Sequence, residues 1–147
     1  MGLSSKGRVA VAGAAIAALL AACGSSGQQN EDFIAQGDEI CALGTFQIGA
    51  EAQNRYGQPQ APPRKSREFA REVVAPILRA QVLDKLRALN APPDDVEELN
   101  ALFAALERGI ERLRANPGLL TEPNAGGVFD EANRRAQAYG FNQCGQG

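Results

Sequence analysis

The sequence predicts an all-α protein, a four-helix antiparallel up-down bundle with a kinked second helix and one disulfide. Apolar residues recur at helical spacing in four segments, whereas the alternating runs typical of strands are almost absent. Turns rich in Pro, Gly and Asn separate these segments, and short connections make successive helices antiparallel neighbours. A length of 147 residues, with 44% hydrophobic and 22% charged residues, suits one globular domain.

The first 22 residues precede the bundle and have the layout of an export signal. Lys6 and Arg8 form a short basic region, and residues 9–20 are uncharged and apolar. A helix of this apolar length is about 18 Å long, which is too short for a hydrocarbon core of roughly 30 Å. We therefore expect residues 1–22 to be a signal peptide that is removed during export.

The end of this signal is its most specific part. Leu20, Ala21 and Ala22 precede Cys23, and this sequence resembles the lipobox of bacterial lipoproteins. The resemblance implies that Cys23 receives a diacylglycerol thioether and becomes the N-terminus after cleavage by a dedicated peptidase. The alternative is a plain secretory signal in which Cys23 has no role. Because small polar residues follow, we expect lipidated Cys23 and a flexible tether over 23–30, and the bundle domain over 31–147.

The first predicted helix covers residues 31 to about 56. Gly37, Gly44 and Gly49 interrupt it, each at a cost of up to about 1 kcal/mol relative to Ala. Such small residues either let another helix approach closely or leave room for a ligand. Its inner face is formed by the apolar residues Phe33, Ile34, Ile40, Cys41, Ile48 and Tyr56.

The second predicted helix covers about residues 64–89 and has a broad apolar face. Pro76 lies inside it, and an interior proline costs roughly 3 kcal/mol. We therefore expect either a kink at Pro76 or a break into two helices. A short turn over residues 90–93 then reverses the chain.

The third predicted helix has the clearest pattern, a stripe of apolar residues three and four apart. Asp94, with Glu97 three residues later, resembles a capping box at its start. The sequence 116–118, Asn-Pro-Gly, is a stop signal. The stripe consists of Val96, Leu99, Phe103, Leu106, Ile110 and Leu113.

The fourth predicted helix covers about residues 127–139. Glu131 and Arg135 form an i,i+4 pair in the favoured order, as do Asp130 and Arg134. Gly140 suits a helix C-terminus. The residues that we expect to face inward are Val128, Phe129, Ala132, Ala136 and Tyr139.

The chain contains three cysteines. If Cys23 carries the lipid, Cys41 and Cys144 remain, and an extracytoplasmic location permits a disulfide between them. This bridge would close a loop of about 100 residues and contribute at most ~4–5 kcal/mol; the alternative is two buried free thiols. The spacing of Ala136, Gly140 and Cys144, behind a lipobox and a cysteine in the first helix, resembles the layout of small uncharacterised helical lipoproteins of actinobacteria. That resemblance implies no activity.

The inventory of reactive side chains predicts no enzyme. The chain has no histidine, which excludes His-based acid–base catalysis, Ser-His triads and imidazole metal sites. No glycine-rich nucleotide-binding motif is present, and a net charge of −2 argues against nucleic-acid binding. We therefore expect no catalytic residue, no metal site and no cofactor. A carboxylate enzyme would need two acids that converge in one pocket, which no motif in the sequence indicates.

One basic cluster stands out, namely Arg64, Lys65, Arg67 and Arg71. It is a candidate contact to anionic lipid headgroups or to a polyanionic wall polymer. The alternative is a solvated helix face that is paired with Glu68 and Glu72.

These features together predict a lipoprotein anchored in the cell membrane by its N-terminal lipid and exposed on the extracytoplasmic face. We expect it to act as a non-enzymatic interaction or envelope-associated module, with an unknown envelope protein or cell-wall component as its partner. The alternative is a bundle that binds a small apolar ligand beside the glycines of the first helix.

Overall fold

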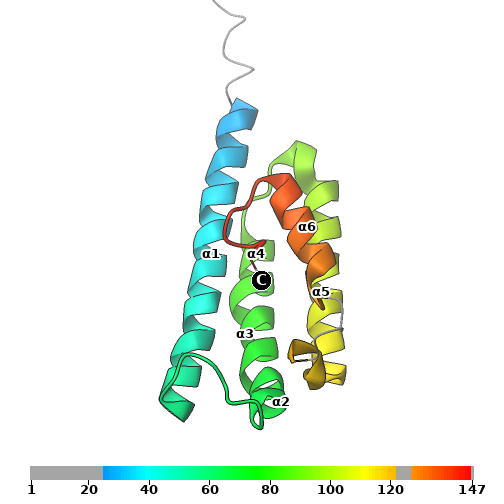
Figure 1. Cartoon of the computed structure of the whole chain (residues 1–147). Coiled ribbons are helices and arrows are strands. Elements are labelled where there is room, and N and C mark those ends of the chain that lie inside the picture. The colour runs from blue at the N-terminus through cyan, green and yellow to red at the C-terminus, as the bar shows by residue number, and fades with distance from the viewer. Residues whose placement is uncertain (1–24, 122–126, 147) are drawn as a thin grey trace, which may run out of the picture.

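Four helical rods that alternate in direction form the part of the chain that the computed structural model describes, residues 25–121 and 127–146 (Figure 1). They are α1 (Ser25–Tyr56), a second rod from Ser66 to Ala88, α5 (Val96–Ala115) and α6 (Asp130–Tyr139). The described residues contain no strand, so the all-α, up-down prediction is confirmed. The predictions for the signal peptide and for Cys23 fall outside these residues.

Helix α1 begins at Ser25, six residues before the predicted start. The predicted flexible tether over 23–30 is therefore wrong for residues 25–30, which are helical. The side chain of Asn30 explains the difference, because its amide donates to the Asp95 carboxylate at 3.0 Å and to the Tyr139 hydroxyl at 3.1 Å. These contacts fix the first turns of α1 against two other elements that are distant in sequence.

The second rod passes through Pro76 without a break. It consists of α2 (Ser66–Phe69), η1 (Ala70–Val74), α3 (Ala75–Ile77), η2 (Leu78–Leu83) and α4 (Asp84–Ala88). The η1 and η2 segments are π-helical: the Ala75 amide donates to the Ala70 carbonyl and the Asp84 amide to the Arg79 carbonyl, five residues back. Pro76 therefore lies in a continuous rod between two π segments, and the expected irregularity takes this form rather than that of two separate helices.

The start of α5 differs from the prediction. The 3-10 turn η3 (Pro93–Asp95) leads into the helix, and no side chain caps it, so the capping box is not formed. Val96 is 44% exposed and does not belong to the buried stripe, whereas Leu99, Phe103, Ile110 and Leu113 are buried. The predicted stop is confirmed, because the Asn116 side chain accepts from the Gly118 amide as the 3-10 turn η4 (Pro117–Leu120) begins.

Helix α6 is the shortest rod and packs mainly against α5. It meets α1 at its last turn, where the rings of Phe33 and Tyr139 lie 6.0 Å apart. Gly140, at φ +113°, ends the helix as predicted, and Phe141 returns to the core with 3% exposure. The remaining C-terminal residues cross to α1 as an irregular, bent tail (Figure 1).

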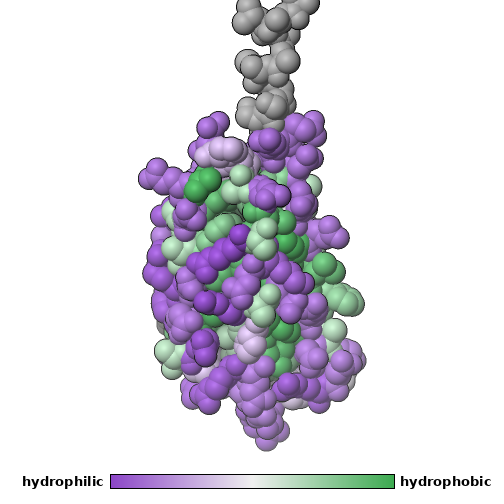
Figure 2. All heavy atoms as spheres, turned by 180° about the vertical axis from the view of Figure 1, so that it is seen from behind, coloured by the Kyte–Doolittle hydropathy of each residue, from purple (hydrophilic) through white to green (hydrophobic). Residues whose placement is uncertain are grey.

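The core lies between the rods and is almost wholly apolar, with Leu83, Leu99, Ile110 and Leu113 fully buried. A Cβ on Gly37 would collide with Phe141, and one on Gly44 would collide with Val82, so these glycines admit the tail and the second rod. No described helix is long and apolar enough to cross a bilayer. Seen from behind, hydrophobic residues gather along the middle of the molecule, and its ends are mainly hydrophilic (Figure 2).

Candidate functional site

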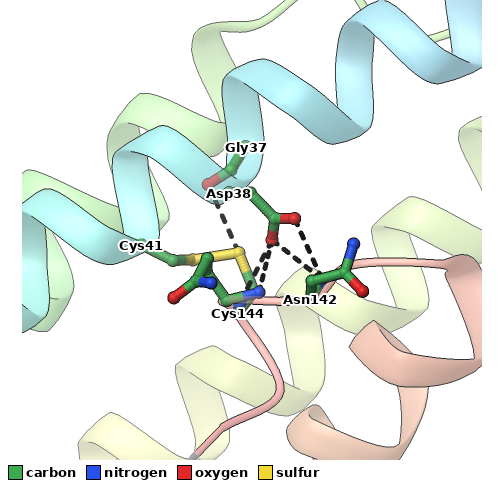
Figure 3. The surroundings of a disulfide bond; sticks show 6 residues. Gly37, Asp38, Cys41, Asn142 and Cys144 are labelled. Carbon is green, nitrogen blue, oxygen red and sulfur yellow. Dashed lines mark hydrogen bonds between the residues drawn. A yellow bond between two sulfur atoms is a disulfide. The ribbon is translucent and has the colours of Figure 1, made fainter.

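A disulfide joins the C-terminal tail to the middle of α1, as the sequence predicts. Cys41 and Cys144 are bonded, with Cα atoms 5.1 Å apart, and the alternative of two free thiols is wrong (Figure 3). The Cys144 sulfur also lies 3.3 Å from the Gly37 carbonyl oxygen. This is a contact rather than a hydrogen bond, because a disulfide sulfur carries no hydrogen.

One carboxylate on α1 holds the same tail in place. Asp38 accepts hydrogen bonds from the Asn142 amide at 2.9 and 3.0 Å and from the Gln143 amide at 2.7 Å. The Cys144 amide donates to it more weakly, at 3.4 Å (Figure 3). Three successive backbone N–H groups therefore surround one charge, which fixes the tail where it passes over the core. No pattern in the sequence marks Asp38, since its partners are backbone groups more than a hundred residues away.

Beneath the tail lies a cavity of about 190 Å³ at the meeting point of all four rods. Its walls are apolar side chains from the second rod, α5 and α6, and the disulfide itself forms part of the lining. Ala132 and Ala136 on α6 are buried wall residues, and their short side chains leave space that larger ones would fill. The principal wall residues are Leu78, Val82, Leu86, Leu102, Leu106 and Phe129.

The rim of this cavity is polar but uncharged. Thr45, Gln143 and Gln146 are exposed lining residues, and Asn133 is half-buried. Among the residues that the structure describes, no ionisable side chain lines the cavity. The site therefore suits a small, neutral, mainly apolar molecule, with hydroxyl and carboxamide groups at the entrance for one polar end.

The glycines that suggested a ligand site do not line this cavity. Gly37 and Gly44 serve close packing, and a Cβ on Gly49 would meet no atom within 4 Å. The useful signal is instead the pair of small inward residues on the last helix, Ala132 and Ala136. The sequence analysis placed both on the inner face, but spacing alone does not reveal the space left opposite them.

A second hollow of about 320 Å³ lies between the start of α1 and the α4–α5 connection. It is larger than the core cavity, but its lining residues Gln29, Asp32 and Gln36 are exposed and polar. Such a surface is well hydrated, so we regard the smaller, apolar cavity as the better ligand site.

A buried tyrosine is hydrogen-bonded near the start of α1, at the same end of the bundle as this second hollow. The Tyr139 hydroxyl donates to the Asp95 carboxylate at 2.8 Å and accepts from Asn30 at 3.1 Å. Burial raises the pKa of Tyr139 above its usual value, and the hydrogen bond to Asp95 raises this pKa further. This network joins α1, the start of α5 and the end of α6. Its hydrogen bonds hold these three elements together at this end of the bundle.

The basic cluster Arg64, Lys65, Arg67 and Arg71 lies at the opposite end, at the start of the second rod, and is exposed. Within the described parts of the chain, Lys65 is the one member that is paired, donating to Glu68 at 2.8 Å. This hydrogen bond raises the pKa of Lys65 and lowers the pKa of Glu68. Glu72, expected to pair with the cluster, instead accepts from Arg55 at 3.0 Å. The predicted pairing is thus only partly present.

Among the described residues, no group of His, Cys, Asp or Glu side chains could hold a metal ion. Two large apolar side chains on the outer face of α1 are exposed, Leu43 at 49% and Phe46 at 72%. A scan against protein-family models finds no family that matches, and searches of curated proteins and of solved structures likewise find no match.

Proposed function

We propose that the protein is a membrane-anchored, extracytoplasmic lipoprotein that acts as a non-enzymatic binding module. The anchor is proposed from the lipobox-like residues 20–23 behind a basic and apolar leader. The Cys41–Cys144 disulfide supports a location outside the reducing cytoplasm, where such bonds persist. The lack of histidine throughout the chain supports a binding role rather than a catalytic one.

The observation that carries the binding role is the apolar core cavity. A dry, engineered cavity of about 150 Å³ binds benzene, and the volume beneath the tail is about 190 Å³. A ligand of this site is therefore a small ring or a short alkyl chain. We thus propose that the envelope module holds a small apolar ligand. The site is the cavity beneath the tail and not the glycine face of α1.

The ligand site can be tested with indole as the probe. The chain contains two tyrosines but no tryptophan, so excitation beyond the tyrosine absorption band gives indole fluorescence free of protein background. We expect the emission of indole to shift to shorter wavelength with the purified lipoprotein in detergent, and Ala136→Leu to reduce that shift to the level of protein-free micelles by filling the cavity. Because micelles also take up indole, the measured quantity is the difference between variants.

Ala138→Leu is the matched control, since Ala138 is exposed on the same helix and does not line the cavity. Indole binding should be unchanged in this variant, and both variants should keep their helical circular dichroism. Equal shifts for the original protein and Ala136→Leu would contradict binding in this cavity.

The anchor is tested separately by Cys23→Ala. We expect this substitution to release the protein from the membrane fraction or to leave the signal peptide uncleaved, because no thiol remains to accept the lipid. Metabolic labelling with a radioactive fatty acid should also be lost. Unchanged labelling and fractionation would refute the lipoprotein assignment.

A further inference from the structure

Charge is separated along the length of the bundle. At the end where α1 begins, the segments 25–35 and 89–100 contain no Lys or Arg but carry an acidic pole, Glu31, Asp32, Asp94, Asp95, Glu97 and Glu98. At the other end, the segments 53–72 and 110–120 contain three acids, Glu68, Glu72 and Glu111, against seven bases. They carry a basic pole, namely Arg55, Arg64, Lys65, Arg67, Arg71, Arg112 and Arg114.

Packing brings the members of the basic pole together from three elements. Arg55, near the end of α1, reaches Glu72 of the second rod at 3.0 Å, and the rings of Tyr56 and Phe69 lie 5.8 Å apart. The η4 turn that follows α5 packs against α2. The end of α1, the start of the second rod and the end of α5 therefore share one end of the molecule (Figure 1).

Several cations of this pole are free to bind a partner. Lys65 and Arg114 pair with acids on their own helices, and Arg55 pairs with Glu72 and Glu51. In the described parts of the chain, ion pairs are absent from the other members of the pole, all of which are exposed. These free cations are Arg64, Arg67, Arg71 and Arg112.

The acidic pole is equally well defined. The Asn30–Asp95 hydrogen bond of 3.0 Å brings the first turns of α1 beside the start of α5. Acids at a helix N-terminus are stabilised by the helix dipole, which accounts for Glu97 and Glu98 in the first turn of α5.

The two poles are far apart on the electrostatic scale. Helix α1 has 32 residues and so spans about 48 Å. The Debye length at physiological ionic strength is about 8 Å. A charged surface that touches one pole is therefore fully screened from the other.

We propose that the basic pole binds a polyanionic polymer of the cell envelope at a distance from the membrane that holds the anchor. The orientation rests on the proposed lipidation of Cys23. Cys23 lies two residues before the start of α1, and two residues reach at most about 7 Å. The acidic pole therefore lies beside the bilayer and the basic pole projects outward, which favours a polymer over the headgroups of the protein's own membrane.

The test uses the mature lipoprotein in phosphatidylcholine vesicles with poly(glycerol phosphate) as the polyanion. We expect binding to weaken as salt rises, and the double variant Arg67→Gln/Arg71→Gln to weaken it roughly tenfold or more. The matched control is Lys85→Gln/Arg134→Gln, which removes the same charge from two exposed residues outside both poles that form no ion pair in the described parts of the chain. This control should bind within about twofold of the original protein, as expected for an electrostatic contact confined to one pole.

Equal losses in the two double variants, or no polymer binding at low salt, would overturn the proposal. A second arm adds one part phosphatidylglycerol to two parts phosphatidylcholine in the same vesicles. Unchanged polymer binding is expected, since the pole lies several Debye lengths from the bilayer. Loss of polymer binding would instead assign the pole to anionic headgroups.

The anchor and the basic pole give separate readouts. Cys23→Ala should still bind the polymer in solution, because the arginines of the pole do not depend on the lipid. A failure of lipidation would therefore change membrane fractionation and leave polymer binding intact. If instead the polymer proposal is wrong, the protein would fractionate with the membrane but would not bind the polymer.

Discussion

Asp38 illustrates how one side chain secures a long-range contact in this protein. Its carboxylate accepts from the amides of Asn142 and Gln143, and it is half-buried beneath the tail. Hydrogen bonds to a charged group contribute about 1.5–3 kcal/mol each when well shielded, and less when solvent has access.

We predict that Asp38→Ala lowers the free energy of unfolding by about 1–2 kcal/mol, because the tail amides lose their charged acceptor. Urea denaturation measures this change, and amide hydrogen exchange at residues 142 and 143 should become faster. Glu39→Ala is the control, since Glu39 is exposed and makes no hydrogen bond or ion pair within the described residues. A loss of stability that is equal in both variants would contradict the role given to Asp38.

Tyr139 predicts a pH dependence at the alkaline end. Its pKa is raised in the folded protein by burial and by Asp95, whereas an unfolded tyrosine titrates near pH 10. Below about pH 10 both states hold the proton, and the contribution of Tyr139 to stability is complete. Above that pH only the unfolded state releases the proton, so stability falls by up to about 1.4 kcal/mol per pH unit.

We therefore expect the urea midpoint to fall more steeply between about pH 10 and 11 in the original protein than in Tyr139→Phe. The slope is compared rather than the absolute stability, because Tyr139→Phe also removes the hydrogen bond to Asp95. Equal slopes would show that Tyr139 titrates alike in the folded and unfolded states.

At the scale of one residue, the sequence predicts burial better than partners. Helical spacing placed Tyr139 on the inner face, and the structure buries it. Its acceptor Asp95 lies 44 residues earlier, and no local pattern links the two. The same limit applies to the capping box that the spacing of Asp94 and Glu97 predicts, since a local pattern reflects only neighbours along the chain.

Helix α1 contains a matched pair of glycines in different surroundings. A Cβ on Gly44 would collide with Val82 of the second rod, whereas one on Gly49 would meet nothing within 4 Å. We predict that Gly44→Ala destabilises the fold by about 1–3 kcal/mol through overpacking. Gly49→Ala should stabilise it by up to about 1 kcal/mol, because alanine favours the helix.

Thermal or urea unfolding of the two variants provides the measurement, and circular dichroism verifies that both remain helical. Stabilisation by both substitutions would show that α1 and the second rod do not approach closely at Gly44. The two substitutions are chemically identical, so a difference in sign isolates the effect of packing from that of helix propensity.

Element positions were predictable where one strong pattern dominates, as in α5, whose apolar stripe gave the helix and its buried face. The π segments on either side of Pro76 were not predictable, because helix propensity describes the α conformation and does not include a switch to wider π turns. The early start of α1 was missed for a related reason. The composition of residues 24–30 is that of a linker, and only the tertiary hydrogen bonds of Asn30 show otherwise.

For the whole molecule, the disulfide is the main covalent constraint. It joins residues 103 apart in sequence, and a loop of about 100 residues corresponds to ~4.7 kcal/mol of chain entropy in the unfolded state. We predict that Cys144→Ser lowers the free energy of unfolding by about 2–5 kcal/mol. Urea titrations with and without reductant test this, since reductant should destabilise the original protein and leave Cys144→Ser unchanged.

The alternation of the rods and the disulfide were predictable because cysteine pairing and short turns constrain topology strongly. The cavity was not predictable, because it depends on how far the small residues Ala132 and Ala136 stand from the opposite wall. A helical pattern shows which residues face inward but not how much volume they fill. The charge separation was visible only once packing had placed the end of α5 beside α2.

The bridge between α1 and the tail also determines what a protease can release. The exposed loop at residues 57–60 joins α1 to the second rod, and exposed loop tips are the preferred sites of nicking. A cut there divides the backbone, but the Cys41–Cys144 bond still links the N-terminal piece to everything that follows. If Cys23 carries the proposed lipid, the larger fragment therefore stays linked to the anchor until the Cys41–Cys144 bond is reduced.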